Sequence, residues 1–329
     1  MAISLAGKTA IVTGAGSGIN LAFTGHLLAR QCNVLLADLS LRPEAEDLVH
    51  RHSSRTKLSH GRAVFQKTDV RAWKDLDGMF ERAKQEFGGQ VEVVCPGAGV
   101  YEPTWSSFWH PPGSPGSKDD PQGNQYASLD INLTHPIRTT QLAIQHFLSG
   151  RSSSPSSTTT PPGQHPPKLN VVHISSIAGQ RTPMPAAIYN ATKHAINGFV
   201  RSLALLDKSL GVRVTCVAPG VIKTPLWTDN PDKMRLLAEG DEWVTPEEVA
   251  DTMGALVGAD EVEVQAVGGE EGEKRVKVEG GLVVEISKGR RRVVVQYGDP
   301  GPEGRAGNTV GGMDAEEESI LARLGREGF

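Results

Sequence analysis

The sequence of 329 residues predicts a doubly wound α/β fold, in which a mostly parallel sheet of seven strands is covered by helices on both faces. Two observations lead to this prediction. Between residues 9 and 224, short apolar runs rich in β-branched residues alternate with stretches of helical spacing. These runs are largely apolar and β-branched, which is typical of parallel strands buried on both faces. A chain of this length can also bury the core of such a fold.

The expected strands are apolar runs that end near small or polar residues. In chain order they are Thr9–Thr13, Asn33–Ala37, Ala63–Lys67, Val91–Cys95, Leu169–Ile174, Val212–Val217 and Leu282–Ile286. Helices are expected between them, over residues 19–30, 73–87 and 188–206. In the second of these helices, apolar residues recur every three or four positions, which predicts one buried face.

Residues 1–257 are expected to form the α/β core, which carries two inserts. The first insert, residues 102–125, holds prolines and glycines together with the aromatic residues Trp105, Phe108 and Trp109. The second, residues 149–167, is almost entirely Ser, Thr, Pro and Gly, a composition that predicts a mobile loop. Because ligands bind beyond the carboxyl ends of the strands, only the first insert is expected near a ligand.

Residues 258–329 are expected to form a C-terminal extension. It includes the last strand of the sheet, which can pair with residues 292–297 across the sequence Ser-Lys-Gly-Arg. Acidic residues after Asp314, a favourable N-cap, predict a terminal helix that Gly325 ends.

Composition excludes several classes of protein. The mean hydropathy is −0.28 and no apolar run approaches eighteen residues, so no membrane-spanning helix is expected. A net charge of −4 argues against a nucleic-acid partner. Cys32, Cys95 and Cys216 lie far apart in apolar runs, which predicts neither a disulfide framework nor a metal site. With no secretory signal at the N-terminus, a cytoplasmic location is expected.

A glycine-rich turn predicts a nucleotide site. Residues 13–20 (Thr-Gly-Ala-Gly-Ser-Gly-Ile-Asn) lie between the first strand and the first helix. Glycines there let the backbone approach a pyrophosphate, which a helix N-terminus favours. The next strand ends at Asp38, whose carboxylate can bind both hydroxyls of an adenosine ribose and repels a 2′-phosphate. This pattern favours NAD over NADP. A solvated carboxylate at a strand end is the alternative for Asp38.

Tyr189 and Lys193 are the candidate catalytic pair. Residues four apart share one face of a helix, so the phenol and the ammonium can point into one cleft. A phenol has an ordinary pKa near 10, and a nearby cation favours its ionised form. The pair therefore suits proton exchange with an alcohol or a carbonyl. Such pairs also occur often by chance.

Together these motifs resemble the short-chain dehydrogenase/reductase family, whose members have a Rossmann fold and bind NAD or NADP. Residues 13–19 match the family's nucleotide motif, in which Asn20 replaces the last glycine. That replacement implies either a first helix that stands slightly away from the strand or an asparagine side chain that leans outward. The family's Asn-Asn-Ala-Gly after the fourth strand appears here as Pro96–Gly99, without the two amides.

The resemblance extends to the catalytic residues. Ser176 stands thirteen residues before Tyr189, the spacing of the family's serine, whereas Ser175 would make the gap fourteen. Asn132 matches the helix asparagine that anchors a water in the family's proton relay; its alternative is an asparagine bonded only to its own backbone. In the implied mechanism, Ser176 and Tyr189 hold the substrate oxygen, Tyr189 exchanges its proton, and Lys193 lowers the Tyr189 pKa.

The resemblance implies two sets of site residues. The catalytic residues are Asn132, Ser176, Tyr189 and Lys193. The cofactor-binding residues are Gly14, Ser17, Gly18, Ile19, Asp38, Asp69, Val70, Gly97, Tyr189, Lys193, Ile222 and Thr224. The ten histidines form no ligand pair with a carboxylate partner at helical spacing, so no metal is expected.

These features predict an enzyme that interconverts a secondary alcohol and a ketone with NAD, NADP being the less favoured cofactor. The aromatic residues of insert 102–125 and the apolar residues of 225–243 indicate a bulky apolar substrate, although the aromatic residues also suit local packing. The sequence is most similar to the fungal branch of the family, whose members are often described as resembling 15-hydroxyprostaglandin dehydrogenase. The resemblance also implies a homodimer or homotetramer.

A non-catalytic NAD(H)-binding regulatory or interaction protein on the same fold is the alternative. It is supported by Asn20, by the missing amides at residues 96 and 97, and by the acidic, glycine-rich C-terminal third. The complete set of Asn132, Ser176, Tyr189 and Lys193 argues against it.

Overall fold

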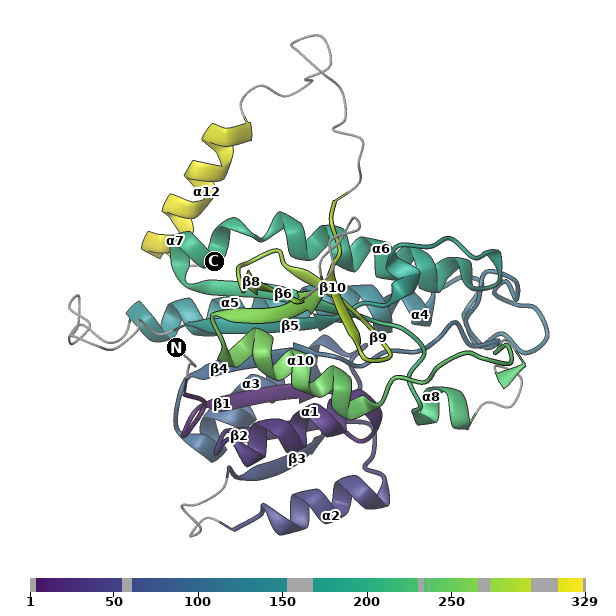
Figure 1. Cartoon of the computed structure of the whole chain (residues 1–329), viewed down its shortest axis with the longest axis horizontal. Coiled ribbons are helices and arrows are strands. Elements are labelled where there is room, and N and C mark those ends of the chain that lie inside the picture. Colours follow the sequence, from purple (N-terminus) through teal and green to yellow (C-terminus); the bar gives the residue numbers. More distant parts are fainter. Residues whose placement is uncertain are drawn as a thin grey trace.

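An eight-stranded sheet forms the centre of the computed structural model (Figure 1). The structure describes residues 4–54, 61–152, 168–229, 234–235, 237–265, 273–296 and 313–327. The strands, in their order across the sheet, are β10 (Arg290–Val293), β9 (Val283–Ser287), β6 (Val212–Pro219), β5 (Leu169–Ile174), β4 (Val91–Pro96), β1 (Thr9–Thr13), β2 (Asn33–Asp38) and β3 (Ala63–Lys67). Every neighbouring pair is parallel except β9–β10. The predicted fold class is confirmed, with one strand more than expected.

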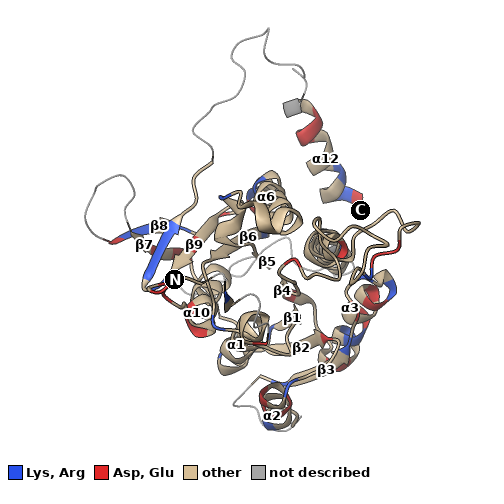
Figure 2. Ribbon diagram, turned by 90° about the vertical axis from the view of Figure 1, so that its right-hand side faces the viewer, with Lys and Arg blue, Asp and Glu red and all other residues tan. Residues whose placement is uncertain are grey.

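Helices cover both faces of the sheet (Figure 2). One face carries α1 (Gly18–Ala29) and α10 (Pro246–Gly258), and the other carries α3 (Trp73–Phe87), α5 (His135–Ser152) and α6 (Ala187–Ser202). Neighbouring residues of β1 serve the two cores, because side chains alternate along a strand. Val12 packs with the α1–α10 face and Ile11 with the opposite face.

Shorter elements connect this framework. The helices are α2 (Pro43–Arg51), α4 (Ala127–Leu129), α7 (Leu205–Leu210), α8 (Pro225–Thr228) and α12 (Met313–Glu327). A π-helical turn, η1 (Asp130–Thr134), leads into α5, and two 3-10 turns, η2 (Ile177–Gly179) and η3 (Met184–Ala186), precede α6. Strands β7 (Glu261–Gln265) and β8 (Glu273–Lys277) pair as a separate antiparallel sheet.

The C-terminal extension follows the prediction in part. Strand β9 joins the main sheet beside β6, and β10 pairs back on it. Strand β10 begins at Arg290, two residues before the predicted range, because Arg290 pairs with Ser287 and the turn is shorter than the predicted Ser-Lys-Gly-Arg. Helix α12 lies beside α7 (Figure 1). It begins at Met313 and continues through Gly325, so Asp314 is not its N-cap and Gly325 does not end it. The packing of α12 against α7 explains this, since packing outweighs the weak helix propensity of glycine.

Two other expectations differ from the structure. The predicted helix 188–206 is two helices, α6 and α7, separated at residues 203–204. The insert 149–167 begins inside α5, which runs to Ser152, and its remaining residues, 153–167, lie outside the described residues. None of the helices in the described part of the chain is both long and apolar enough to cross a membrane.

Candidate active site

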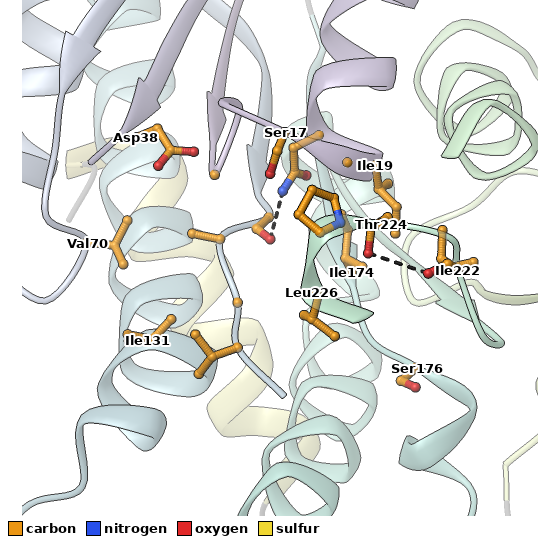
Figure 3. Close-up of a pocket in the computed structure, with 18 of the residues that line it drawn as sticks. Ser17, Ile19, Asp38, Val70, Ile131, Ile174, Ser176, Ile222, Thr224 and Leu226 are labelled. Carbon is orange, nitrogen blue, oxygen red and sulfur yellow. Dashed lines mark hydrogen bonds between the residues drawn. The ribbon is translucent and has the colours of Figure 1, made fainter. Parts of the chain in front are cut away.

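A cavity of about 610 Å³ lies at the carboxyl ends of the parallel strands (Figure 3). Its wall comes from the loops after β1, β2, β3, β4, β5 and β6. In Figure 3, Asp38 and Ser17 lie at one end of the cavity and Ser176 at the other. The lining contains every predicted cofactor-binding residue and three of the four predicted catalytic residues: Gly14, Ser17, Gly18, Ile19, Asp38, Asp69, Val70, Gly97, Ser176, Tyr189, Lys193, Ile222 and Thr224.

The glycine turn has the geometry of an anion cradle. Gly14 and Gly18 have φ of +70° and +59°, in the left-handed region that favours glycine. A Cβ at Gly14 would lie 2.7 Å from the Cα of Ala98, so no side chain fits there. The first turn of α1 carries no acidic residue, and Ser17 makes no side-chain cap bond. The N-terminus of α1 is therefore free to favour a phosphate group.

Asp38 is bound to this turn. Its Oδ2 accepts a 2.8 Å hydrogen bond from the backbone N–H of Gly16, and its Oδ1 accepts one of 2.7 Å from Leu39. Arg42, the basic residue that follows, forms an ion pair with Asp229, just beyond α8. The carboxylate thus lies beside the turn, and the nearest guanidinium in the sequence is held by another acid.

Asn20 does not lean outward. It is only 8% exposed, and its side chain points inward. Its Nδ2 donates a 3.0 Å hydrogen bond to the carbonyl oxygen of Gly97, after β4. The expectation of an outward side chain was wrong, because the missing side chain at Gly97 leaves room for this amide.

Asp69 and Val70 follow β3 at the same end of the cavity. Arg71 donates to the Asp69 carboxylate from its backbone N–H at 3.0 Å, from Nε at 3.0 Å and from Nη2 at 2.6 Å. These hydrogen bonds hold the pKa of Asp69 below its usual value. The Asp69 carboxylate therefore stays ionised at neutral pH and is paired with Arg71.

Ser176, Tyr189 and Lys193 meet at the opposite end. Lys193 Nζ donates a 2.9 Å bond to the carbonyl oxygen of Ile174 and lies 5.3 Å from the centroid of the Tyr189 ring. The Ser176 hydroxyl, which accepts from the Ala178 N–H at 3.1 Å and donates to the Pro219 carbonyl oxygen at 3.4 Å, lies close enough to Tyr189 to lower its pKa. The hydroxyl of Ser175, the alternative serine, instead donates to the carbonyl oxygen of Lys193 at 3.0 Å. Geometry therefore favours Ser176 as the partner of Tyr189.

Burial favours the neutral form of both titratable groups. It raises the pKa of Tyr189 to about 12, and the hydrogen bond from Ser176 opposes this rise. Burial also lowers the pKa of Lys193 to about 8. The phenol therefore holds its proton at neutral pH, as a proton donor must, and Lys193 changes charge close to neutrality.

Asn132 does not reach the cavity. It lies in η1 with only 2% of its surface exposed. Its Nδ2 donates a 2.8 Å bond to the carbonyl oxygen of Val100, and its Oδ1 accepts a 2.9 Å bond from the Val100 N–H. The side chain thus fastens the loop after β4 to the π-helical turn. It is neither at the cavity wall nor bonded only to its own helix.

His135 and Thr13 were missed by sequence reasoning. His135 is buried, with Nδ1 at 3.0 Å from the carbonyl oxygen of Ile131 and Nε2 at 3.0 Å from Thr13 Oγ1. A carbonyl only accepts, so Nδ1 carries the proton and Nε2 accepts from Thr13. Burial lowers the pKa of His135 to about 4, which agrees with a neutral ring. This pair joins the turn that carries Asn132 to the end of β1.

The aromatic residues of insert 102–125 divide into two groups. Trp105 lines the cavity together with Leu226 and Trp227. Phe108 and Trp109 lie outside the lining, are 54% and 48% exposed, and stack edge to face on each other. Local packing is therefore the better description of these two.

Tyr101 and Glu102 connect this insert to the catalytic helix, and neither was predicted. The Tyr101 ring meets the Tyr189 ring at 4.8 Å and the Trp227 ring at 5.5 Å. The Glu102 carboxylate accepts from the Tyr189 N–H at 2.9 Å and from the Phe108 N–H at 3.0 Å. The insert is thereby fixed against the first turn of α6.

Comparison with known proteins decides the family. The family model of the short chain dehydrogenases matches residues 8–235. The chain belongs to the short-chain dehydrogenase family. It is therefore an oxidoreductase, and it shares the family's use of NAD(P). Within the described residues, no group of three or more His, Cys, Asp or Glu side chains is arranged to hold a metal ion.

Relatives of the short-chain dehydrogenase include several enzymes. L-fucose dehydrogenase of Bos taurus is 29% identical over 73% of this chain and 77% of its own. 15-Hydroxyprostaglandin dehydrogenase [NAD(+)] of Rattus norvegicus is 30% identical over 67% and 70%. Tetrahydroxynaphthalene reductase of Pyricularia oryzae is 29% identical over 68% of each chain. The predicted family resemblance, including that to 15-hydroxyprostaglandin dehydrogenase, is confirmed.

A solved structure shows the same fold. It is the 3-ketoacyl-(acyl-carrier-protein) reductase from Brucella melitensis complexed with NADH, with a TM-score of 0.58 and 21% identity over 77% of this chain and 92% of that one. Since these relatives are named as dehydrogenases and reductases, the comparisons do not favour the non-catalytic alternative.

Proposed function

We propose that this short-chain dehydrogenase interconverts a secondary alcohol and a ketone on a bulky apolar substrate, with NAD as the preferred cofactor. One observation carries the proposal. A single cavity has the glycine turn and Asp38 at one end and Ser176, Tyr189 and Lys193 at the other. The cavity can therefore hold a dinucleotide at the first end and the carbonyl or alcohol group of a substrate at the second.

The residues present fit a nicotinamide dinucleotide. The left-handed glycines and the uncapped N-terminus of α1 suit the pyrophosphate, and Asp38 suits the adenosine ribose. Ile222 and Thr224, which follow β6, are the proposed neighbours of the nicotinamide; Thr224 Oγ1 lies 3.5 Å from the Ile222 carbonyl oxygen (Figure 3). When bound, the nicotinamide supplies the hydride donor or acceptor.

The chain's own residues handle the proton. In the direction of reduction, Ser176 and Tyr189 bind the substrate oxygen and Tyr189 donates its proton to it. In oxidation, Tyr189 accepts that proton, and a protonated Lys193, 5.3 Å from the ring centroid, favours the phenolate. Asn132 and His135 act at a distance from the substrate, by fixing the loop after β4 and the π-helical turn.

The preference for NAD follows from charge. Asp38 would face a 2′-phosphate as a like charge, and Arg42, which is close enough in sequence to neutralise one, is paired with Asp229. Leu39, which also lines this end of the cavity, supplies no cation.

The substrate class follows from the wall near Tyr189. Trp105, Leu226 and Trp227 line it, and Tyr101 packs against both Tyr189 and Trp227. Such a wall favours an apolar alcohol or ketone, for example a steroid, a polyketide or a fatty-acyl derivative.

The proposal includes a homodimer or homotetramer in the cytoplasm. The outer faces of α5 and α6 are the proposed subunit contact, and the three cysteines are buried and free, as suits a reducing compartment. Sedimentation at micromolar concentration tests the assembly; a monomer would contradict it.

A substrate screen tests the activity. The protein is incubated with apolar and hydrophilic secondary alcohols and with NAD or NADP, and formation of the reduced cofactor is followed by absorbance. We expect turnover of apolar alcohols, and a loss of at least about 1000-fold in kcat for Tyr189→Phe with little change in cofactor Kd. Undiminished turnover in Tyr189→Phe, or strict selectivity for small hydrophilic alcohols, would contradict the proposal.

A further inference from the structure

The side-chain amide of Asn20 forms part of the floor of the cofactor cavity. It extends from the first turns of α1 into the space beyond the end of β4. Its Nδ2 donates to the Gly97 carbonyl oxygen at 3.0 Å, and its Oδ1 accepts from the Cys95 thiol at 3.7 Å. Although only 8% exposed, Asn20 lines the cavity together with Gly14 and Gly97. A polar group of the first helix thus lies between the two glycine-containing turns.

Glycine at position 97 is explained by the space that the Asn20 amide occupies, and not by the backbone conformation of Gly97. Its φ lies outside the left-handed region that favours glycine. A Cβ at this position would lie 2.7 Å from Asn20 Cγ and 2.9 Å from Asn20 Nδ2, and its three nearest neighbours are all atoms of this amide. A side chain at position 97 would therefore displace the Asn20 amide from its present position.

We propose that Asn20 is a cofactor-positioning residue and that Asn20 and Gly97 form a reciprocal pair, in which helix α1 supplies the amide that the end of β4 lacks. The inference rests on the proposed function, because it takes this cavity as the dinucleotide site. The bond to the Gly97 carbonyl orients the peptide between Gly97 and Ala98. A preset floor of this kind lowers the cost of ordering the site on binding.

The same contact removes two arguments for a non-catalytic protein. Asn20 in place of glycine and the missing amides at residues 96 and 97 look like two separate losses in the sequence. In the structure the two features are connected, because the side-chain amide of Asn20, a residue of α1, lies at the end of β4 and binds the Gly97 carbonyl oxygen there.

Titration of NADH fluorescence tests the role of Asn20 without relying on turnover. We expect Asn20→Ala to raise the Kd for NADH about tenfold, the effect of one lost hydrogen bond. Asn33→Ala is the control, because the Asn33 side chain also forms one hydrogen bond with the backbone, in which its Oδ1 accepts from the Arg62 N–H at 3.0 Å, but lies at the start of β2 and outside the cavity lining. Its Kd should stay that of the wild type. A fall in Tm for Asn20→Ala with an unchanged Kd would overturn the inference, since a structural role alone predicts it.

A double substitution tests the reciprocity. Gly97→Asn should raise the Kd at least about 100-fold or prevent folding, because its side chain collides with Asn20. Asn20→Gly combined with Gly97→Asn should fold and bind NADH within about threefold of the wild type. The double variant should also bind NADH more tightly than Asn20→Gly alone. If the free-energy losses in NADH binding caused by the two single substitutions add in the double variant, the pairing is refuted.

NADH binding by the wild type tests the proposed function, and NADH binding by Asn20→Ala tests the role of Asn20. If the wild type binds neither NADH nor NADPH, the proposed function is wrong. If the wild type binds NADH and Asn20→Ala binds it equally well, only the role of Asn20 is wrong.

Discussion

Removing the charge of Asp38 should change the cofactor preference of the enzyme. The two oxygens of this carboxylate accept hydrogen bonds from the Gly16 and Leu39 N–H groups, at 2.8 and 2.7 Å. Alanine would remove both of these bonds and disturb the glycine turn. Asparagine keeps one acceptor and loses the charge, so Asp38→Asn is the cleaner perturbation.

The magnitude follows from the position of the carboxylate. A ribose hydroxyl in contact with Asp38 would place a 2′-phosphate about 5 Å from it. Two unit charges at that separation repel by about 3 kcal/mol at an effective dielectric constant near 20, or roughly 100-fold in preference. Asp38→Asn should therefore lower the ratio of kcat/KM for NAD to kcat/KM for NADP by about that factor. Adding Leu39→Arg, at a position that lines the cavity and is 58% exposed, should reverse the preference.

Steady-state kinetics with both cofactors, at one fixed substrate concentration and ionic strength, measures this ratio. Asp47→Asn is the control, because it removes the same charge from the exposed surface of α2, away from the cavity lining. Its ratio should equal that of the wild type. An unmodified protein that uses both cofactors equally well would show that Asp38 does not face the ribose. An unchanged ratio in Asp38→Asn would show the same.

Three further substitutions or conditions give separate tests. Gly14→Ala should abolish NADH binding in a fluorescence titration, because its Cβ would lie 2.7 Å from Ala98 Cα at a φ of +70°. Gly25→Ala is the control, since the space around Gly25 in α1 is open. It should leave NADH binding intact and raise the free energy of unfolding by about 0.5–1 kcal/mol. Glu102→Ala should lower the free energy of unfolding by about 1–3 kcal/mol, because the N–H groups of Tyr189 and Phe108 lose a charged acceptor. The same substitution should lower kcat by a larger factor than it raises the cofactor Kd. Equal stability of the variant and the wild type in urea titrations would contradict the bridging role of Glu102. Burial lowers the pKa of His135 to about 4 and that of His173 to about 3, so the unfolded chain binds more protons than the folded one below about pH 6.5. The free energy of unfolding should therefore fall by about 2 kcal/mol per histidine between pH 7 and pH 5. Urea unfolding of His173→Gln should show a smaller pH dependence than that of the wild type, and an equal pH dependence would exclude this cause.

Local pattern was enough to predict most of the framework. The bounds of β1, β3, β5 and α3 coincide with the predicted ranges, because each is a largely apolar run or an amphipathic stretch. The hairpin of β7 and β8 was missed, although its pattern was present. Val262 and Val264 alternate with glutamates and are buried, but the surrounding glycines and acids obscured the period of two.

Contacts between distant segments could not be predicted in the same way. Asn20 points inward because Gly97, 77 residues later, has no side chain. Glu102 binds the N–H of Tyr189, 87 residues away, and no local period encodes that pairing. Trp105 lines the cavity whereas Phe108 and Trp109 do not, and this distinction depends on how the insert folds back on α6.

The position of β9 has a consequence for synthesis and for shortened chains. Strand β6 is buried along its full length, yet its outer neighbour, β9, comes from about 65 residues further along the chain. Until residues 283–287 leave the ribosome, β6 presents a row of unpaired backbone groups that another nascent chain could match. Strand β10 then covers this edge with three consecutive arginines, which disfavour further strand addition. The C-terminal extension is thus the closing piece of the sheet, and a chain cut after residue 257 would be prone to aggregate.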